Sequence, residues 1–305
     1  MQVINPGVAS RADELAARFA AASPFRHCVI EEFFEPGFAR ALLEQFPGFE
    51  QGDHLNEDGR PGGKSTHERM RELGESYRAL DELVASPAFL AMLGRITGID
   101  DLRYDPMYFG GGTHENRDGQ ALDLHIDFNY HPLTGWHRRL NLIVYLNPEW
   151  EPSWGGALAL HRDPYDPAAD SAVQILPLFN RGVVFETTER SWHGFDRITL
   201  PPGGTTGSRR SVAFYFYTEA RPDAETAPTH STIYVDRDLP GHLVPGHTLS
   251  AADCQALQAM LHDQRGHSRR LYRQIEQLQA ELEHSPLGRV LAMLRRRLAR
   301  WRMRR

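Results

Sequence analysis

Five short apolar runs between residues 140 and 217 constrain the fold of this chain more than any other feature. None is long enough for a helix of ordinary length, and Gly, Pro, Asn or Asp residues separate each run from the next. The runs cover residues 140–146, 157–160, 173–176, 182–185 and 211–217. Short strands punctuated by turns are typical of sandwiches and barrels, so the pattern predicts a mainly β core of the jelly-roll kind.

Helical patterns flank this β-rich segment on both sides. Residues 11–22, 36–46 and 76–98 carry apolar side chains at helical spacing, and Pro87 predicts a break near Ser86. Residues 27–34 and 102–110 are further strand candidates, whereas four prolines mark 220–250 as loop. Helical spacing returns over residues 251–262 and 271–282.

These patterns predict an α+β chain with three parts. We expect one domain over 1–220, including its N-terminal support helices, then a loop-rich connector over 221–250 and a helical tail over 251–305. Residues 51–66 are polar and rich in glycine, which favours a mobile loop; an active-site lid is the alternative. Asp58 stands where a phosphate-binding loop needs its first glycine, so nucleotide binding is rejected there.

A candidate metal site begins with His125 and Asp127, which lie on one side of whatever strand carries them. His193 is the best placed of the remaining histidines to supply a second imidazole. Two histidines and one carboxylate bind one face of an octahedral metal and leave positions open for oxygen and a co-substrate, which favours non-haem Fe(II). His131 and His137 are rival ligands, although their polar loop sequence favours a solvated or substrate-facing position.

A candidate anion site lies on the last apolar run. Alternation along that strand puts Arg209, Ser211, Ala213 and Tyr215 on one face, with small residues beside the guanidinium where a ligand has room. A buried arginine requires an anion, because an unpaired charge is costly to remove from water.

Residues 115–217 carry motifs of a known family. A His-x-Asp pair, a distal His and an Arg that opens a late strand together resemble the 2-oxoglutarate- and Fe(II)-dependent oxygenases of the prolyl-4-hydroxylase-like group. The matching pieces are residues 119–127, 139–147, 154–158, 192–194 and 209–213, about a third of the chain. Residues 24–34 also resemble the usual beginning of this family.

The resemblance implies a double-stranded β-helix (jelly-roll) core with Fe(II) held by His125, Asp127 and His193. It also implies that Arg209 pairs with the distal carboxylate of 2-oxoglutarate, for which a bidentate guanidinium is suited. Tyr145 matches the family tyrosine that donates its hydroxyl to the same carboxylate.

Two further residues belong to this expected co-substrate site. Asn141 faces the same way as Tyr145 by alternation, and we expect it to touch the co-substrate nearer the metal. The gap from His193 to Arg209 is longer than in the family's shorter members, which leaves Arg210 as an alternative anchor.

The expected activity is that of a dioxygenase. It would use Fe(II), O2 and 2-oxoglutarate, with ascorbate as a candidate addition, to hydroxylate a C–H bond of an amino acid, peptide or small metabolite and release succinate and CO2. Because Asp127 is present, a halide-binding variant of the site is disfavoured. The alternatives are a non-catalytic jelly-roll module that binds a glycan or peptide, and a cupin-like metalloenzyme without 2-oxoglutarate.

The charge of the chain is unevenly distributed. The formal net charge is −6, but residues 287–305 contain eight arginines and no acid, which leaves 26 basic and 40 acidic residues in 1–286. An acidic body argues against nucleic acid as the substrate. The arginines surround an apolar stripe, so the end of the tail is expected to bind an anionic membrane surface, or to self-associate or dock on the acidic body.

Cysteine usage and hydropathy bear on the compartment. The two cysteines, Cys28 and Cys254, stand in no redox-like or metal-like spacing, which favours free thiols in a reducing compartment. No apolar run approaches the length of a membrane span, and the first residues lack the core of a signal peptide. We therefore expect a cytoplasmic protein, with peripheral membrane attachment through the basic tail as an option.

Overall fold

The structure, a computed structural model, describes residues 3–55, 61–166, 168–201, 207–235 and 239–284. Contacts divide the chain into two compact units, one of Met1–Leu55 with Pro61–Asp236 and the other of Asn56–Arg60 with Arg237–Arg305. The domain limits expected from the sequence stay predictions.

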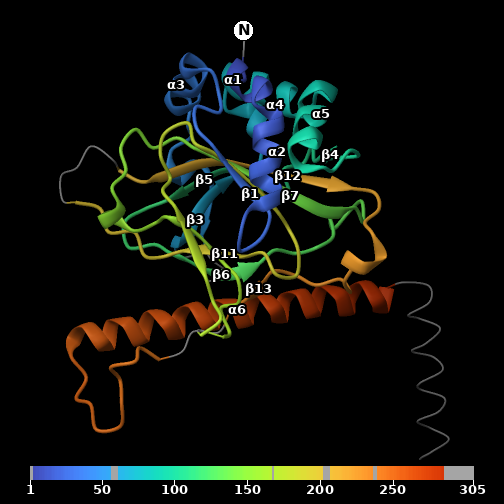
Figure 1. Ribbon diagram of the computed structural model, residues 1–305. Helices are drawn as coiled ribbons and strands as arrows, with labels where there is room; N and C mark the ends of the chain where they lie inside the picture. The colour runs from blue at the N-terminus through green and yellow to red at the C-terminus, as the bar shows by residue number, and fades with distance from the viewer. Residues whose placement is uncertain (1–2, 56–60, 167, 202–206, 236–238, 285–305) are drawn as a thin grey trace, which may run out of the picture. The chain divides into compact units, whose positions relative to one another are not determined.

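Two antiparallel sheets form the core of the first unit (Figure 1). The larger sheet contains β1 (His27–Ile30), β2 (Asp53–Leu55), β3 (Pro61–His67), β4 (Arg103–Tyr104), β5 (Gly112–Asn116), β7 (His137–Tyr145), β10 (Gly182–Glu186) and β12 (Arg209–Thr218). The smaller sheet contains β6 (Leu122–Ile126), β8 (Leu158–His161), β9 (Ala172–Ile175), β11 (Trp192–Phe195) and β13 (Ile233–Tyr234).

The strands follow the order β1-β10-β7-β12-β5-β3-β2 in the larger sheet, with β4 on β12, and β13-β6-β11-β8-β9 in the smaller one. From β5 to β13, consecutive strands alternate between the two sheets except for the paired strands β8 and β9, as in a jelly roll. The expected fold class, a jelly-roll core with flanking helices, is confirmed.

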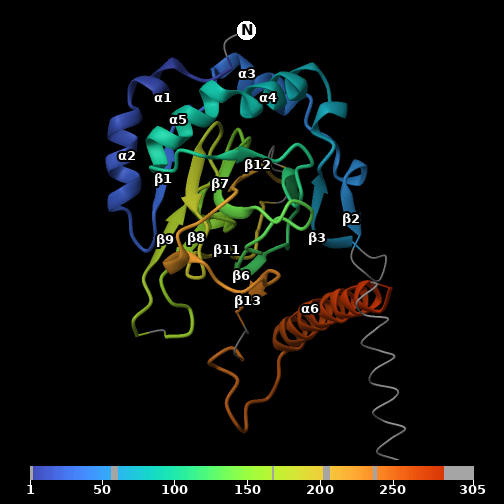
Figure 2. The ribbon, with the colours of Figure 1, turned by 90° about the vertical axis from the view of Figure 1, so that its right-hand side faces the viewer.

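Five helices pack together on one face of the larger sheet (Figures 1 and 2). They are α1 (Pro6–Ser10), α2 (Ala12–Ala21), α3 (Pro36–Glu44), α4 (Glu75–Ala85) and α5 (Pro87–Thr97). The predicted break at Ser86 is confirmed, since its hydroxyl accepts a hydrogen bond from the Phe89 N–H and Pro87 opens α5.

Alternation along β7 and β12 separates two hydrophobic layers. One set of side chains packs against the helices: Leu140, Leu142, Val144, Val212, Phe214 and Phe216. The residues between them point the other way, and Tyr145 joins a second cluster between the sheets with Leu158, Leu160, Ile175, Val183 and Phe185. The alternation predicted for β12 from Arg209 onwards agrees with this division, which directs Arg209 and Tyr145 into the space between the sheets.

The segment 51–66 is not the loop that its polar sequence predicts. Its described part contains β2 and most of β3, and β3 pairs with β5 so that Ser65 lies opposite Glu115. These strands extend the larger sheet at its edge. Edge strands are often polar, which is why the apolar pattern that marks the other strands is absent here.

The strand predicted over 102–110 is mostly wrong. Only β4 pairs in that range, and the longer strand is β5, which begins after it. Asp105 interrupts the extended chain, because its carboxylate accepts hydrogen bonds from the backbone N–H groups of Met107 and Phe109. Such side-chain bonds favour a turn over a strand.

The second unit contains α6 (Ala251–His284), a single helix where the sequence predicts two separate helical segments. None of the described helices combines the length and the apolar character needed to cross a membrane. The predicted basic helix over 287–305 lies outside the described residues.

Candidate functional site

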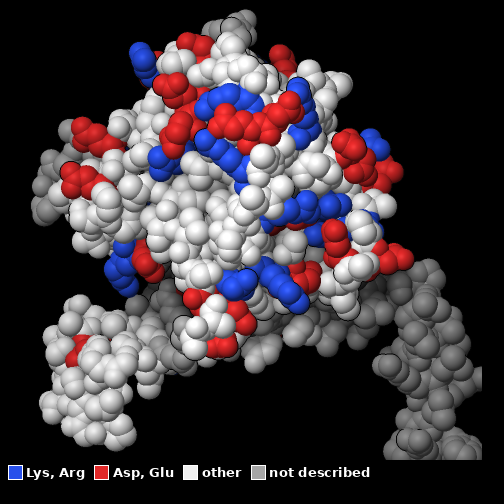
Figure 3. Space-filling view, viewed as in Figure 1, with Lys and Arg blue, Asp and Glu red and all other residues white. Residues whose placement is uncertain are grey.

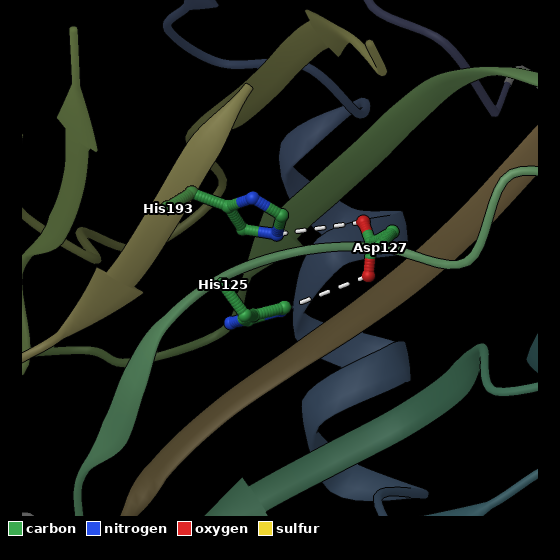
Figure 4. Close-up of side chains that lie close together, drawn as sticks. All are labelled: His125, Asp127 and His193. Atoms are coloured by element: carbon green, nitrogen blue, oxygen red, sulfur yellow. Dashed lines mark ion pairs between the residues drawn. The ribbon is translucent and has the colours of Figure 1, made fainter. Parts of the chain in front are cut away.

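Three side chains converge between the sheets: His125 from β6, Asp127 just after it, and His193 from β11 (Figure 4). The two strands are antiparallel neighbours with His193 opposite His125, and the imidazole centroids lie 4.3 Å apart. The Asp127 carboxylate lies 3.7 Å from His125 Nε2 and 3.5 Å from His193 Nε2. One ligand atom from each residue can be chosen so that all three lie within 4.8 Å of one another.

Backbone carbonyls orient both imidazoles. His125 Nδ1 lies 2.8 Å from the Asp123 carbonyl oxygen, and His193 Nδ1 lies 2.8 Å from that of Ser191. A carbonyl oxygen can only accept a hydrogen bond, so each Nδ1 carries a proton and Nε2 is the ring nitrogen that faces the carboxylate. This is the arrangement in which histidines bind metals.

The charge states also suit a divalent metal. Burial, reinforced by the neighbouring His125, lowers the pKa of His193 to about 4. Burial acts to raise the pKa of Asp127, but the Arg138 guanidinium and the two imidazoles outweigh it and hold that pKa well below its ordinary value. At neutral pH the site therefore offers a neutral His193 and an anionic carboxylate, as metal binding requires.

A buried arginine forms an ion pair with the Asp127 carboxylate. Arg138 is 1% exposed, and its Nη2 lies 3.0 Å from Asp127 Oδ2. Asn141 joins the two, since its Nδ2 donates to Asp127 Oδ2 at 2.8 Å and its Oδ1 accepts from Arg138 Nε and Nη2. The guanidinium also lies over the rings of Tyr215 and Phe128, with centroid distances of 3.5 and 4.5 Å.

This arrangement gives Asn141 partners that the sequence does not predict. Its amide meets Asp127 and Arg138, and the expected contact with the co-substrate stays a prediction. Arg138 itself is missed because the pairing of β7 with β12 contains a bulge: Phe216 lies opposite Leu140 and Tyr217 opposite Arg138. The extra residue turns Arg138 onto the face that strict alternation assigns to its neighbour, and the only hint in the sequence is a pair of arginines at the start of the strand.

The predicted anion site contains a buried cation. Arg209 is 4% exposed; its Nε donates to the Gly156 carbonyl at 2.7 Å and its Nη2 to the Tyr145 hydroxyl at 3.3 Å. Within the described part of the chain, no carboxylate forms an ion pair with Arg209, and burial lowers its pKa despite the partial compensation by Tyr145. Such a guanidinium is suited to an anionic ligand.

Arg210, the alternative anchor, has a different environment. Its side chain is 37% exposed, and its Nε lies 3.2 Å from the Glu115 carboxylate. Because this guanidinium already has an anionic partner and faces away from Tyr145, the geometry favours Arg209 as the anchor of the two.

Gly156 allows the backbone to approach Arg209 closely. Its φ is +68°, and a Cβ there would lie 2.9 Å from the Trp150 ring, 3.0 Å from Ile198 and 3.3 Å from Arg209 Cδ. Only glycine fits this conformation and space without strain. The glycine therefore allows the Gly156 carbonyl to accept the hydrogen bond from Arg209 Nε.

The rival histidines do not join His125, Asp127 and His193. His131 is buried, not solvated as its loop position predicts: its Nδ1 accepts from the backbone N–H groups of Leu133 and Thr134, and its Nε2 lies 3.5 Å from the Asp105 carboxylate. His137 lies against the Tyr130 ring, with 4.7 Å between centroids.

A strand that the sequence does not predict completes the smaller sheet. Within the segment expected to be loop, β13 pairs with β6 so that Tyr234 lies opposite His125, with 5.2 Å between the ring centroids. Two residues are too few to produce a readable alternation, so hydrophobic periodicity offers no signal for this strand.

Part of the chain is similar to one family of known proteins. Residues 111–217 match the family model described as the 2OG-Fe(II) oxygenase superfamily. The chain is 28% identical to prolyl 3-hydroxylase OGFOD1 of Mus musculus over 209 residues, 64% of this chain and 33% of the relative. The chain thus spans about a third of the length of that curated relative.

Solved structures of similar shape include two prolyl hydroxylases. One, from Trichoplax adhaerens in complex with a hypoxia inducible factor oxygen degradation domain peptide fragment, has a TM-score of 0.48 at 16% identity over 70% of this chain and 94% of that chain. A prolyl-4-hydroxylase from Pseudomonas putida has a TM-score of 0.45 at 17% identity over 70% of this chain and 100% of that chain. Residues 111–217, which include His125, Asp127 and His193, are therefore similar to the 2OG-Fe(II) oxygenase superfamily.

Proposed function

We propose that this protein is an Fe(II)- and 2-oxoglutarate-dependent dioxygenase that hydroxylates a C–H bond and releases succinate and CO2. The observation that carries the proposal is a pair of neighbouring features between the sheets: a His-Asp-His set whose ligand atoms converge, and a buried guanidinium without an anionic partner among the described residues. A catalytically silent binding module would need neither feature.

Strand β11 connects the two features. His193 and Phe195 are two residues apart on β11, so they lie about 7 Å apart along the strand on the same face. The Arg209 guanidinium lies 4.1 Å from the centroid of the Phe195 ring. A ligand with one end at the His193 site and a carboxylate at the other end would therefore reach Arg209.

The residues have the following proposed roles. His125, Asp127 and His193 hold Fe(II), which together with 2-oxoglutarate and O2 supplies the oxidising chemistry when bound. Arg209 forms charge-assisted hydrogen bonds with the distal carboxylate of 2-oxoglutarate, and Tyr145 donates its hydroxyl to the same group. Ascorbate remains a candidate for keeping the iron reduced.

A peptidyl substrate is the first candidate. The mouse relative is named a prolyl 3-hydroxylase, and the Trichoplax enzyme is described with a bound peptide fragment. In this chain Phe109 is 42% exposed and lies 5.4 Å from the Phe128 ring, next to Asp127 in the sequence. The exposed Phe109 ring, packed against the half-buried Phe128 ring, suits an apolar side chain of a substrate. A free amino acid or small metabolite is the alternative substrate class.

The test is anaerobic metal binding to the full chain. Each of the variants His125→Ala, Asp127→Ala and His193→Ala should bind Fe(II) more weakly. Each should also lack the visible absorbance that forms when the Fe(II)-loaded protein binds 2-oxoglutarate. His161→Ala is the matched control, because His161 lies 2.6 Å from Asp170 in a separate His–Asp pair. Unchanged iron affinity in all three variants would refute the site.

Turnover is then measured as succinate release with a lysate or metabolite library. The wild-type chain should release succinate in proportion to product, and the three variants should not. Substrate oxidation without succinate would instead indicate a metalloenzyme that does not use 2-oxoglutarate.

A further inference from the structure

A second set of two histidines and one carboxylate lies in the second unit, at the start of α6. His242 Nε2 is 2.7 Å from Asp253 Oδ1, and His247 Nε2 is 3.1 Å from Asp253 Oδ2. Within the described part of the chain, only this set and the His125 set bring three such ligand atoms within 4.8 Å of one another. The oxygenase activity does not account for it.

Two consecutive turns bring the imidazoles together. The Leu243 N–H donates to the Pro240 carbonyl, and the His247 N–H donates to the Val244 carbonyl. These turns place both rings against the same carboxylate, with 5.5 Å between their centroids. All three side chains thus come from one short stretch of chain, so no distant element is needed to assemble the set.

Helix capping accounts for Asp253 but not for the histidines. The Asp253 N–H donates to Ser250 Oγ, while Asp253 Oδ2 accepts from the Ser250 N–H and hydroxyl, which completes a reciprocal cap. The cap uses only one carboxylate oxygen and needs no imidazole. The convergence of His242 and His247 on this carboxylate is therefore an additional feature.

The local charge favours a cation. Residues 239–258 contain one acid and neither Lys nor Arg. Figure 3 shows the corresponding surface as almost entirely uncharged. No neighbouring basic side chain of this stretch competes with a metal for the carboxylate.

We infer that His242, His247 and Asp253 bind a divalent cation of the Zn²⁺ class. One ligand atom from each residue can be chosen so that all three lie within 4.8 Å of one another, and tetrahedral ligands about 2.0 Å from zinc lie about 3.3 Å apart. The His242 side chain is 58% exposed, so water can occupy the fourth position. The cation would tie the turns at 240–247 to the first turn of α6.

The test counts zinc bound by the full chain, with Zn²⁺ alone in competition with a chromophoric chelator. His125→Ala/His193→Ala removes the other candidate metal set, and this variant should still bind one equivalent. Addition of His242→Ala and His247→Ala should remove that equivalent. These last substitutions leave the helix cap intact, and circular dichroism should show unchanged helix content. No zinc on the variant with both His242 and His247 present would overturn the inference.

Two controls separate this set from nearby groups. His161→Ala should not change the zinc count, because its pair with Asp170 lacks a third ligand. Cys254→Ser should also retain the zinc; loss of zinc in this variant, as strong as in the histidine variants, would assign the metal to the exposed thiol and overturn the proposed set.

The wild-type count distinguishes the two metal proposals. Two equivalents are expected, one lost with each pair of histidine substitutions. A single equivalent that depends on His242 and His247 supports the inference while opposing the proposed iron site. A single equivalent that depends on His125 and His193 opposes the inference and supports the proposed iron site.

Discussion

The Arg138→Met substitution tests whether the arginine beside the proposed metal site stabilises its carboxylate. Arg138 is 1% exposed, and its guanidinium is the charged partner of Asp127 at 3.0 Å. Methionine keeps much of the aliphatic volume but removes the charge and both hydrogen bonds to Asn141. In the metal-free protein, Asp127 would then be a buried carboxylate with one amide donor and no cation.

The expected cost is large for one side chain. Removal of one partner from a buried ion pair destabilises a protein by about 3–5 kcal/mol, because the remaining charge stays buried without compensation. Loss of the guanidinium from the Tyr215 ring, 3.5 Å from its centroid, adds about 0.5–2 kcal/mol. We therefore expect the free energy of unfolding to fall by at least about 3 kcal/mol.

The assay is urea unfolding in the presence of a metal chelator, arranged as a double-mutant cycle. In the Asp127→Asn background, Arg138→Met should cost much less, because the substitution no longer leaves a buried carboxylate unpaired. The coupling energy should therefore exceed about 2 kcal/mol. Arg95→Met is the control, since Arg95 pairs with Asp13 at 2.7 Å on the surface, where such pairs contribute about 0–1 kcal/mol.

Metal affinity provides a second readout. If Arg138 and Asn141 hold Asp127 in position, Mn²⁺ affinity should fall about 10–100-fold in Arg138→Met, as for other groups that orient metal ligands. An unfolding cost no larger than that of Arg95→Met, with unchanged Mn²⁺ affinity, would refute the reasoning.

Three further predictions concern the co-substrate, the thiols and the tail. Arg209→Ala should weaken the binding of 2-oxoglutarate by about 2–5 kcal/mol, and Arg210→Ala should weaken it far less. A titration with the reverse ranking would reject Arg209 as the anchor of the co-substrate. At pH 8 a disulfide reagent should modify exposed Cys254 quickly and buried Cys28 slowly, because burial raises the pKa of Cys28 to about 11; two fast thiols would contradict this. The full chain should sediment with anionic vesicles and be released by salt, whereas a chain that ends at Ser285 should not bind them. If the full chain does not bind the vesicles and truncation changes the oligomeric mass, the tail is an assembly element.

Much of the architecture could be predicted because it depends on regular alternation. The apolar runs of β7 and β12 have period two, and the same period indicates that Tyr145 and Arg209 face inward. The proximity of His125 and Asp127 follows from their spacing on one strand. His193 could be named only as a candidate before the family resemblance was considered, because its approach depends on which strands are neighbours, and strand order leaves no periodic signal in a sequence.

The remaining features are departures from regular geometry. A bulge turns Arg138 toward Asp127, and the hydrogen bonds of Asp105 end a strand that hydrophobicity alone would continue. The edge strands β2 and β3 are polar, so they resemble loop in sequence. Each of these features is stabilised by partners far away in the chain or by one particular side chain. The hydrophobic periodicity of a sequence indicates neither kind of contact.

The position of β13 has a practical consequence for the choice of a minimal catalytic fragment. β13 is the outermost strand of its sheet and covers the backbone of β6, which carries His125. The residues ahead of β13 are also hydrogen-bonded to the chain after Asp127. Asn129 donates to the Pro228 carbonyl and accepts from the His230 N–H. A fragment cut at residue 220 would retain every proposed iron and 2-oxoglutarate ligand yet leave β6 as a bare edge, open to pairing with other copies of the chain. A fragment that extends through residue 235 keeps that edge covered and is the better choice for expression.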